Sequence, residues 1–373
     1  MTTINEIFRT YGPLYLDRFA DSIPQTHRKT IQAIIDCRSE ACGLVLFQCD
    51  KCGQSHLSYR SCGNRHCPTC QYQKTQLWLD KQMGRQLPGH HFMLTFTVPE
   101  LLRRFIRKNQ RVAYSALFKA SSEAIKKLAL DEKYIGGDLP GFLGVLHTWG
   151  RTLEYHPHIH YIVPGGALST TDSFWHPSRI DFYLPVKALS KIFKAKFREA
   201  MKQAGLLEQI PSAVWSTDWN VNSQAVGSSE TSLKYLAPYV FKFAISNTRI
   251  IKVENNTVFF HYTKPHSRRL RTMALDTLEF IRRFLQHVLP SGFMKIRYFG
   301  FMNPNCSVPF PKISTLIQIA YGFSLVISEY PKNSPKPLTC SHCGGTLYYV
   351  GSFFTSAGRH IPGRSPKLAW DSS

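Results

Sequence analysis

A cluster of cysteines near the start of the sequence limits the fold of this chain more than any other feature. Seven of the ten cysteines fall between residues 37 and 70, namely Cys37, Cys42, Cys49, Cys52, Cys62, Cys67 and Cys70. Cys-x2-Cys pairs occur at 49/52, 67/70 and 340/343, whereas chance would supply only about 0.3 of a pair. In a protein that is not secreted, such pairs indicate metal sites rather than disulfides. The cluster therefore predicts a zinc-binding module.

The first two pairs predict one tetrahedral zinc site. Two Cys-x2-Cys pairs separated by 14 residues can surround Zn²⁺ with four thiolates. We expect the ligands to be Cys49, Cys52, Cys67 and Cys70. Four thiolates leave no open coordination position, so this zinc is expected to be structural rather than catalytic.

Further zinc ligands stay open at this stage. A second site in the module can use Cys62 and His66, together with Cys37 and Cys42, or these residues are buried thiols and a surface histidine. The third pair, at 340/343, has no obvious partner pair. It is either metal-free or completed by one of Cys306, His342 and His360.

The excess of basic residues predicts a nucleic-acid partner. The chain has 46 Lys and Arg against 24 Asp and Glu, a net charge of +22, and such a charge suits a phosphate backbone. A helix is predicted over 100–130, and arginines form a stripe along one of its faces. The stripe predicts contact with a phosphate backbone, and the alternative is an ordinary solvated helix face. The residues expected to contact DNA are Arg65, Arg103, Arg107, Arg111, Arg268 and Arg269.

The sequence has no run of about 18 apolar residues and no start typical of a secretory signal. We therefore expect a soluble protein of the cytoplasm that has no membrane partner.

The stretch Tyr155–Pro164 contains a candidate catalytic metal site. As a β-strand it places His158 and His160 on one face, where two imidazoles can converge on one divalent ion. About 0.6 His-x-His pairs are expected by chance, so a structural pair is the alternative. Candidates for a third ligand near in the sequence are Glu154, His156 and His147. A regular strand puts His156 on the same face, and it is the third ligand that we expect, although Pro157 can break the register.

A second motif lies further along, where Tyr235 and Tyr239 are neighbours at i and i+4 of a predicted helix and Lys242 follows. Core packing is the more common meaning of such a pair. Pro238 is compatible with a helix only in its first turn, so we expect the helix to begin at or just before Tyr235.

The order of these motifs resembles the rolling-circle transposases of the insertion-sequence ninety-one family. The resemblance rests on the segments Cys62–Cys70, Trp149–His160 and Tyr235–Tyr239. Shorter matches follow at Ala244–Asn247, Glu279–Leu285 and Val288–Pro290. Together they extend over roughly residues 30–345.

This resemblance implies an α+β fold in which helices flank the antiparallel sheet of an HUH endonuclease, a class named for a histidine–hydrophobe–histidine motif. That motif corresponds to His158, Ile159 and His160, and the paired nucleophiles correspond to Tyr235 and Tyr239. The zinc-binding region corresponds to the segment Cys49–Cys70. Lys242 is a candidate for assisting either phenolate.

The implied reaction nicks and rejoins single-stranded DNA through a 5′-phosphotyrosine link. A phenol with a pKa near 10 is a poor nucleophile, and a nearby cation helps it by stabilising the phenolate. The expected cofactors are therefore structural Zn²⁺ and catalytic Mg²⁺ or Mn²⁺, with single-stranded DNA at element ends and target as partner. No ATP is needed, because the covalent link retains the bond energy.

The expected organisation has four parts. Residues 1–90 form a helix and the zinc module, 91–255 the nuclease core, 256–330 its basic C-terminal part, and 331–373 a Pro-rich linker and tail. Two other functions remain open from the sequence: a plasmid-type replication initiator with the same chemistry, and a non-enzymatic zinc-finger protein that binds DNA.

Overall fold

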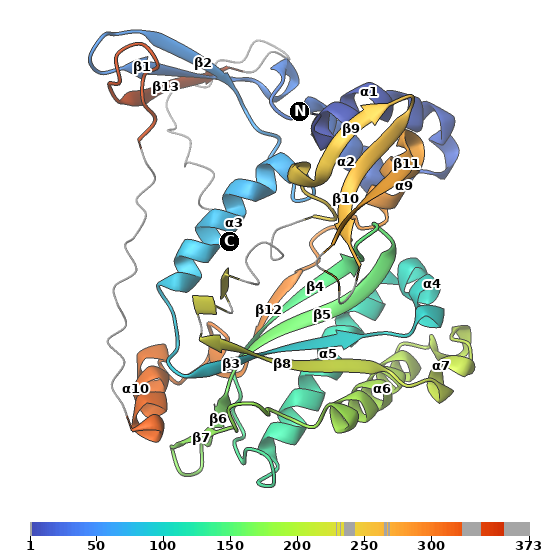
Figure 1. The fold of residues 1–373 in the computed structure, drawn as a ribbon, viewed down its shortest axis with the longest axis vertical. Helices are drawn as coiled ribbons and strands as arrows, with labels where there is room; N and C mark the ends of the chain where they lie inside the picture. Colours follow the sequence, from blue (N-terminus) through green and yellow to red (C-terminus); the bar gives the residue numbers. More distant parts are fainter. Residues whose placement is uncertain are drawn as a thin grey trace. The chain divides into compact units, whose positions relative to one another are not determined.

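The computed structural model describes residues 2–228, 230–231, 233–234, 243–264, 267, 269–322 and 337–353 (Figure 1). The chain forms two compact units. The first comprises Met1–Lys74, Phe241–Val288 and Pro331–Ser373, and the second comprises Thr75–Val240 and Leu289–Tyr330. Helix α3 (Pro68–Met83) contains the boundary between them.

A five-stranded antiparallel sheet organises the second unit. Its strand order is β12-β4-β5-β3-β8. The strands are β3 (His90–Thr97), β4 (Phe142–Trp149), β5 (Tyr155–Pro164), β8 (Asn220–Ser228) and β12 (Ile296–Phe299). The histidine strand β5 is therefore the central strand, with β4 and β3 on its two sides. Because side chains alternate along a strand, the histidines of β5 and its core-facing residues lie on opposite faces of the sheet.

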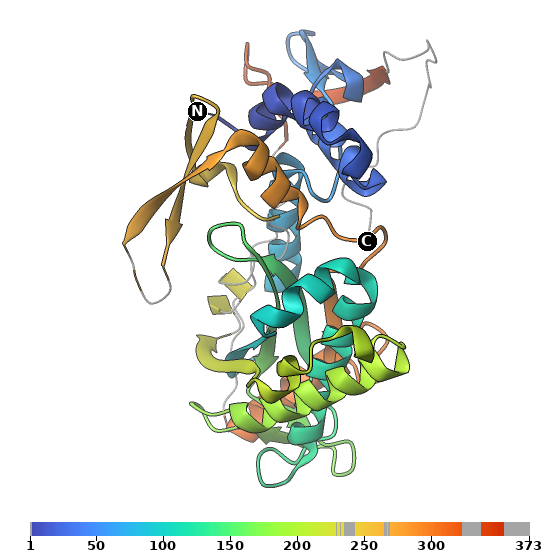
Figure 2. The same cartoon turned by 90° about the vertical axis from the view of Figure 1, so that its right-hand side faces the viewer.

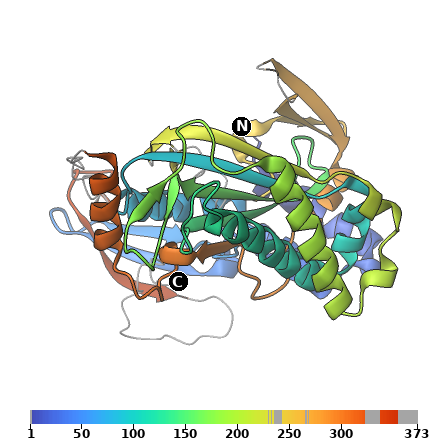
Figure 3. The same ribbon diagram turned by 90° about the horizontal axis from the view of Figure 1, so that it is seen from below.

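Helices cover the apolar face of this sheet. Ile159, Tyr161 and Val163 of β5 point into a buried core with Phe118 and Phe193, which lie on α5 (Gln110–Leu130) and α6 (Val186–Gln203). Figure 3 shows these two helices side by side across the sheet. The alternation expected for β5 is thus confirmed, and it leaves the histidines on the opposite face.

Smaller elements complete the second unit. They are α4 (Glu100–Lys108), α7 (Ala213–Ser216), the ribbon of β6 (Gly166–Leu168) and β7 (Trp175–Pro177), and α10 (Phe310–Tyr321). One helix was expected over 100–130, but Asn109 separates α4 from α5. None of the helices in the described part of the chain is long and apolar enough to span a membrane.

The first unit combines segments from distant parts of the sequence. Its N-terminal helices are α1 (Ile4–Arg18) and α2 (Gln25–Asp36). They share a core with α9 (Thr277–Leu285), in which the Phe284 ring lies 5.0 Å from Phe8 and 4.9 Å from Phe243. In Figure 2 the orange α9 lies beside the dark-blue pair. A sheet of β9 (Ile250–Glu254), β10 (Thr257–Thr263) and β11 (Leu270–Asp276) leads into α9.

A second small sheet of the first unit pairs strands from the N-terminal and C-terminal parts of the described chain. Strand β1 (Leu44–Cys49) pairs with β2 (Ser55–Tyr59) on one edge and with β13 (Leu347–Phe353) on the other. We expected residues 331–373 to be a separate tail. Instead, β13 is an edge strand of the sheet that also contains β1 and β2, here called the N-terminal sheet. Residues 256–288 belong to the first unit with the N-terminal helices rather than to the unit of the five-stranded sheet.

Candidate active site and metal centres

The polar face of the central strand β5 presents His158 and His160. Their ring centroids lie 4.8 Å apart. Strand β5 continues through Pro157, since the β3–β5 pairing ends at Thr97 and His158 and requires no backbone donor at position 157. On the other side the β4–β5 register shifts between His147 and Trp149, next to the proline, so the regular pairing holds from His158 onward.

A third histidine joins this pair from the neighbouring strand. His147 of β4 is the direct cross-strand partner of His158, and its ring lies 5.3 Å from that of His158 and 4.6 Å from that of His160. One ring nitrogen from each of the three histidines lies within 4.8 Å of the others. His147 is buried, with 2% of its surface exposed. This arrangement, here called the histidine triad, can hold one metal ion.

Hydrogen bonds set the orientation of two of the triad rings. Nδ1 of His158 lies 2.7 Å from the carbonyl oxygen of His156, to which it can only donate. Nδ1 of His160 lies 2.9 Å from the hydroxyl oxygen of Thr95 on β3. A ligating histidine typically uses its other nitrogen for such a bond, which fixes the tautomer and the ring. His158 therefore has Nε2 available for a metal, and His160 has it available when its Nδ1 donates to the Thr95 hydroxyl.

Two of the triad rings are held in the neutral form that metal binding requires. Burial, reinforced by the neighbouring imidazoles, holds the pKa of His158 well below its usual range. Burial also lowers the pKa of His160 to about 4. Loss of hydration disfavours the imidazolium, so both side chains are unprotonated at neutral pH.

Two of the third-ligand candidates do not join the triad. His156, the one expected, lies beyond the end of β3, and although its ring centre is 5.1 Å from that of His158, its nitrogens are not part of the group that converges. Glu154 lies in the turn before β5, where its carboxylate accepts hydrogen bonds from the backbone amide and hydroxyl of Thr152. Of the three candidates, His147 is therefore the one whose ring nitrogen lies with those of His158 and His160, in place of the expected His156. Extending the predicted β4–β5 hairpin by register would have found it.

The predicted nucleophiles Tyr235 and Tyr239, with Lys242 and Pro238, lie outside the described residues, so their assignment stays a prediction.

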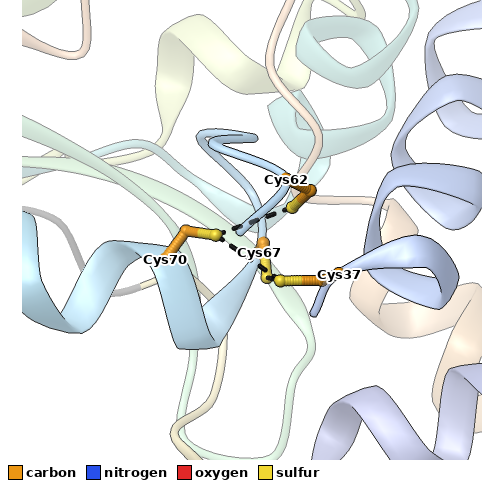
Figure 4. A group of neighbouring side chains, drawn as sticks. All are labelled: Cys37, Cys62, Cys67 and Cys70. Atoms are coloured by element: carbon orange, nitrogen blue, oxygen red, sulfur yellow. Dashed lines mark hydrogen bonds between the residues drawn. The ribbon is translucent and has the colours of Figure 1, made fainter. Parts of the chain in front are cut away.

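Four cysteines of the first unit form one compact cluster, shown in Figure 4. Cys37 follows α2, Cys62 follows β2, and Cys67 and Cys70 flank the start of α3. The distances Cys37–Cys70, Cys37–Cys67 and Cys62–Cys70 between sulfurs are 3.7, 3.6 and 3.6 Å. Tetrahedral Zn–S bonds of about 2.3 Å separate sulfurs by about 3.8 Å. The donor set therefore fits a structural zinc ion.

The surroundings of this cluster favour metal binding. Hydrogen bonding among the four thiols lowers the pKa of Cys37, to about 7, and of Cys67, while it raises the pKa values of Cys62 and Cys70. The buried side-chain amide of Asn5 donates to Cys67 Sγ at 3.7 Å and to the Ile34 carbonyl at 3.0 Å. It thus links the cluster to both N-terminal helices.

The expected grouping of zinc ligands is wrong. Cys49 and Cys52 lie with Cys340 and Cys343 in a separate group and not with the pair at 67/70. The reason is that β13 pairs with β1, which brings residues 340–343 to the first Cys-x2-Cys turn. His66 belongs to neither group, because its buried ring packs against Phe243 at 4.6 Å. Cys42 and Cys306 are also outside both groups.

The arginines predicted to contact DNA are partly engaged within the protein. Arg103 forms an ion pair with Glu100 at 3.4 Å, and the Arg107 guanidinium lies 5.8 Å from the Tyr155 ring centre. Arg111 lies on α5, past the break at Asn109, and donates to the carbonyl of Ser291. Arg65 is half-buried, Arg269 is exposed, and Arg268 lies outside the described residues.

Comparison with known proteins identifies the family. The family model described as "Putative transposase" matches residues 141–308, and the one described as "Transposase zinc-binding domain" matches residues 7–98. Over 319 residues the chain is 34% identical to "Putative transposase y4qJ" of Sinorhizobium fredii (strain NBRC 101917 / NGR234), with 80% of each chain covered. The chain belongs to the insertion-sequence ninety-one family of transposases.

The transposase is also 24% identical over 348 residues to the "Transposase for insertion sequence element IS801" of Pseudomonas savastanoi pv. phaseolicola, with 87% of this chain and 83% of that one covered. No solved structure matches it. Transposases of this family use a rolling-circle mechanism. Family membership confirms the predicted transposase function and the DNA partner, and it favours them over the replication initiator and the non-enzymatic zinc finger.

Proposed function

We propose that the transposase cleaves single-stranded DNA at the histidine triad through a tyrosine nucleophile. The observation that carries the proposal is the convergence of His147, His158 and His160 on the polar face of the nuclease sheet. Three neutral imidazoles suit a divalent transition metal better than Mg²⁺, which prefers oxygen ligands. Mn²⁺ is therefore the more effective of the two expected ions.

The residues of the triad act by binding and orientation. A divalent ion at this position supplies positive charge that offsets the developing charge on the scissile phosphate. The triad leaves coordination positions for phosphate oxygens, because three protein ligands converge there from the described residues. Thr95 and the His156 carbonyl hold the two rings of β5 in place. His147 comes from the other side of the hairpin, so the site depends on the β4–β5 pairing.

Tyr235 or Tyr239 serves as the nucleophile in this proposal. Its phenolic oxygen forms a bond to phosphorus while the bond from phosphorus to the 3′ oxygen breaks, and that oxygen leaves as a 3′-OH after taking up a proton. The 5′ end stays linked to the tyrosine, so rejoining needs no ATP. With two tyrosines, one can hold a first 5′ end while the other cuts again.

Zinc has a separate, structural role in the proposal. The cluster of Cys37, Cys62, Cys67 and Cys70 holds Zn²⁺ between α2 and the start of α3. This position explains why the module of the family includes residues before the first Cys-x2-Cys pair.

Covalent trapping tests the proposed reaction. Purified full-length protein is incubated with labelled single-stranded oligonucleotides tiled across the flanks of its gene, with Mn²⁺, Mg²⁺ or EDTA. We expect a protein–DNA adduct with Mn²⁺ that is lost with EDTA, in His158→Ala/His160→Ala and in Tyr235→Phe/Tyr239→Phe. His176→Ala is the matched control, because His176 lies on β7 of the same unit outside the triad. An undiminished adduct in the double tyrosine variant, or a requirement for duplex DNA, would sink the proposal.

A further inference from the structure

The two Cys-x2-Cys turns at opposite ends of the sequence adopt the same backbone conformation. In the first turn the Gly53 amide donates to the Cys49 carbonyl at 3.1 Å, and in the second the Gly344 amide donates to the Cys340 carbonyl at 2.9 Å. Both glycines are left-handed, with φ of 69° and 70°. This conformation is the one for which glycine is the default residue. The second pair is therefore a complete Cys-x2-Cys-Gly turn rather than a remnant in a polar tail.

These two turns face each other across the β1–β13 sheet. The Cys49 and Cys343 sulfurs lie 3.4 Å apart, and the Cys52 and Cys340 sulfurs lie 3.8 Å apart. All four sulfurs lie within 4.8 Å of one another. Each close pair takes one sulfur from each turn, as expected when two such turns complete a tetrahedron.

We propose that Cys49, Cys52, Cys340 and Cys343 bind a second structural zinc ion, which joins the N-terminal sheet to the C-terminal strand. The four thiols give up their protons on binding, so the ion is held by four thiolates and no open position remains. This site is distinct from the cluster around Cys67, and it does not depend on the reaction proposed above.

The surrounding contacts fix the two turns in register. The Asp50 amide donates to the Thr346 carbonyl at 3.0 Å, and the Thr346 amide donates to an Asp50 carboxylate oxygen at 2.8 Å. A side chain at position 345 would place its Cβ 2.7 Å from the Cys49 sulfur, so only glycine allows this approach. His56 of β2 places Nε2 3.2 Å from the Cys340 sulfur, where it can donate to a thiolate.

The proposed ion stabilises a sheet that is weak without it. A two-stranded hairpin such as β1–β2 is marginally stable in water, and a third strand is normally needed. Here the third strand is β13, whose first residue pairs with Cys49. The Cys-x2-Cys turn that precedes β13 is far from the first such turn in the sequence, with a separation of 288 positions from Cys52 to Cys340. A metal cross-link offsets the chain entropy lost when so long a loop closes.

Zinc content tests the proposal on the full-length protein. The protein is purified under reducing conditions without chelator, and bound zinc is measured by mass spectrometry. With the triad removed by His158→Ala/His160→Ala in every sample, we expect two zinc ions per chain when all cysteines are present, and one after Cys340→Ser/Cys343→Ser or Cys37→Ser/Cys62→Ser. The matched control is Cys306→Ser, which lies outside both groups and is expected to keep two.

Cobalt substitution separates loss of a ligand from loss of folding. A site with four thiolates gives intense sulfur-to-cobalt charge-transfer absorption, and we expect Cys343→His to retain a cobalt site with reduced absorption while Cys343→Ser loses it. Retention of two zinc ions by Cys340→Ser/Cys343→Ser would overturn the proposal. So would a wild-type protein that binds a single zinc ion, since the two cysteine groups would then not both hold one.

Discussion

His147 and His158 are direct cross-strand neighbours in the β4–β5 hairpin, with ring centres 5.3 Å apart. Because of this pairing, the two histidines of the motif on β5 lie together with a third histidine on β4, and all three belong to one hairpin. Because the register of an antiparallel pair fixes which side chains face each other, the third ligand depends on the β4–β5 connection.

The first prediction concerns the identity of the third ligand. We expect His147→Asn to weaken Mn²⁺ binding at least about tenfold, because it removes a nitrogen ligand, while His156→Asn changes it less than about threefold. Isothermal titration calorimetry of both variants measures the difference. The reverse order of effects would restore His156 as the ligand.

The second prediction concerns Thr95, whose hydroxyl lies 2.9 Å from Nδ1 of His160. We expect Thr95→Val, which keeps the shape but removes the hydroxyl, to weaken Mn²⁺ binding by about 10- to 100-fold. Thr95→Ser should restore most of the affinity. Equal affinities in the two variants would show that the hydrogen bond does not orient the ring.

The third prediction concerns Asn5, which is 6% exposed and bonds to the Ile34 carbonyl and the Cys67 sulfur. We expect Asn5→Ala to lower the free energy of unfolding by about 1–3 kcal/mol, since it leaves buried groups without their partner. Chemical denaturation followed by circular dichroism gives the value. Gln32→Ala, on the exposed side of α2, is the control, and an equal loss there would argue against a specific role of Asn5.

The fourth prediction is a pH dependence. Hydrogen bonds and ion pairs with Arg282 and Arg283 lower the pKa of Glu279 to about 2 from an ordinary 4.5. The carboxylate therefore adds stability that is fully present above pH 4.5 and is lost as the pH falls through 4.5 toward 2. We expect Glu279→Gln to unfold at a lower temperature than wild type at pH 7, with the difference vanishing near pH 2. Glu208→Gln, at an exposed glutamate, should show no such convergence.

The local features of this protein could be predicted from sequence patterns, whereas the pairings between distant segments could not. Alternation along Tyr155–Pro164 correctly separated the histidine face from the core face, because strand geometry depends only on neighbouring residues. The cysteine spacing correctly indicated two-residue turns that suit a metal. The grouping of those turns was wrong because it depends on the β1–β13 pairing, which no local pattern encodes.

The same reason explains the domain boundaries. Residues 256–288 carry basic and apolar side chains that fit a nuclease core equally well, and only the packing of Phe284 against Phe8 and Phe243 assigns them to the first unit. The single helix expected over 100–130 was wrong for a local reason, since Asn109 ends α4 before Arg111 is reached.

The pairing of β1 with β13 also has a consequence for synthesis of the protein in the cell. A ribosome that has made Cys52 must add 288 more residues before Cys340 is available. At about 5–20 residues per second this takes roughly 15 to 60 s. During that interval the nascent chain exposes two unpaired thiols and a hairpin edge, and a product that stops early never covers them. Because β13 is synthesised after every strand of the five-stranded sheet, the N-terminal sheet can be completed only in chains that already contain the histidine triad.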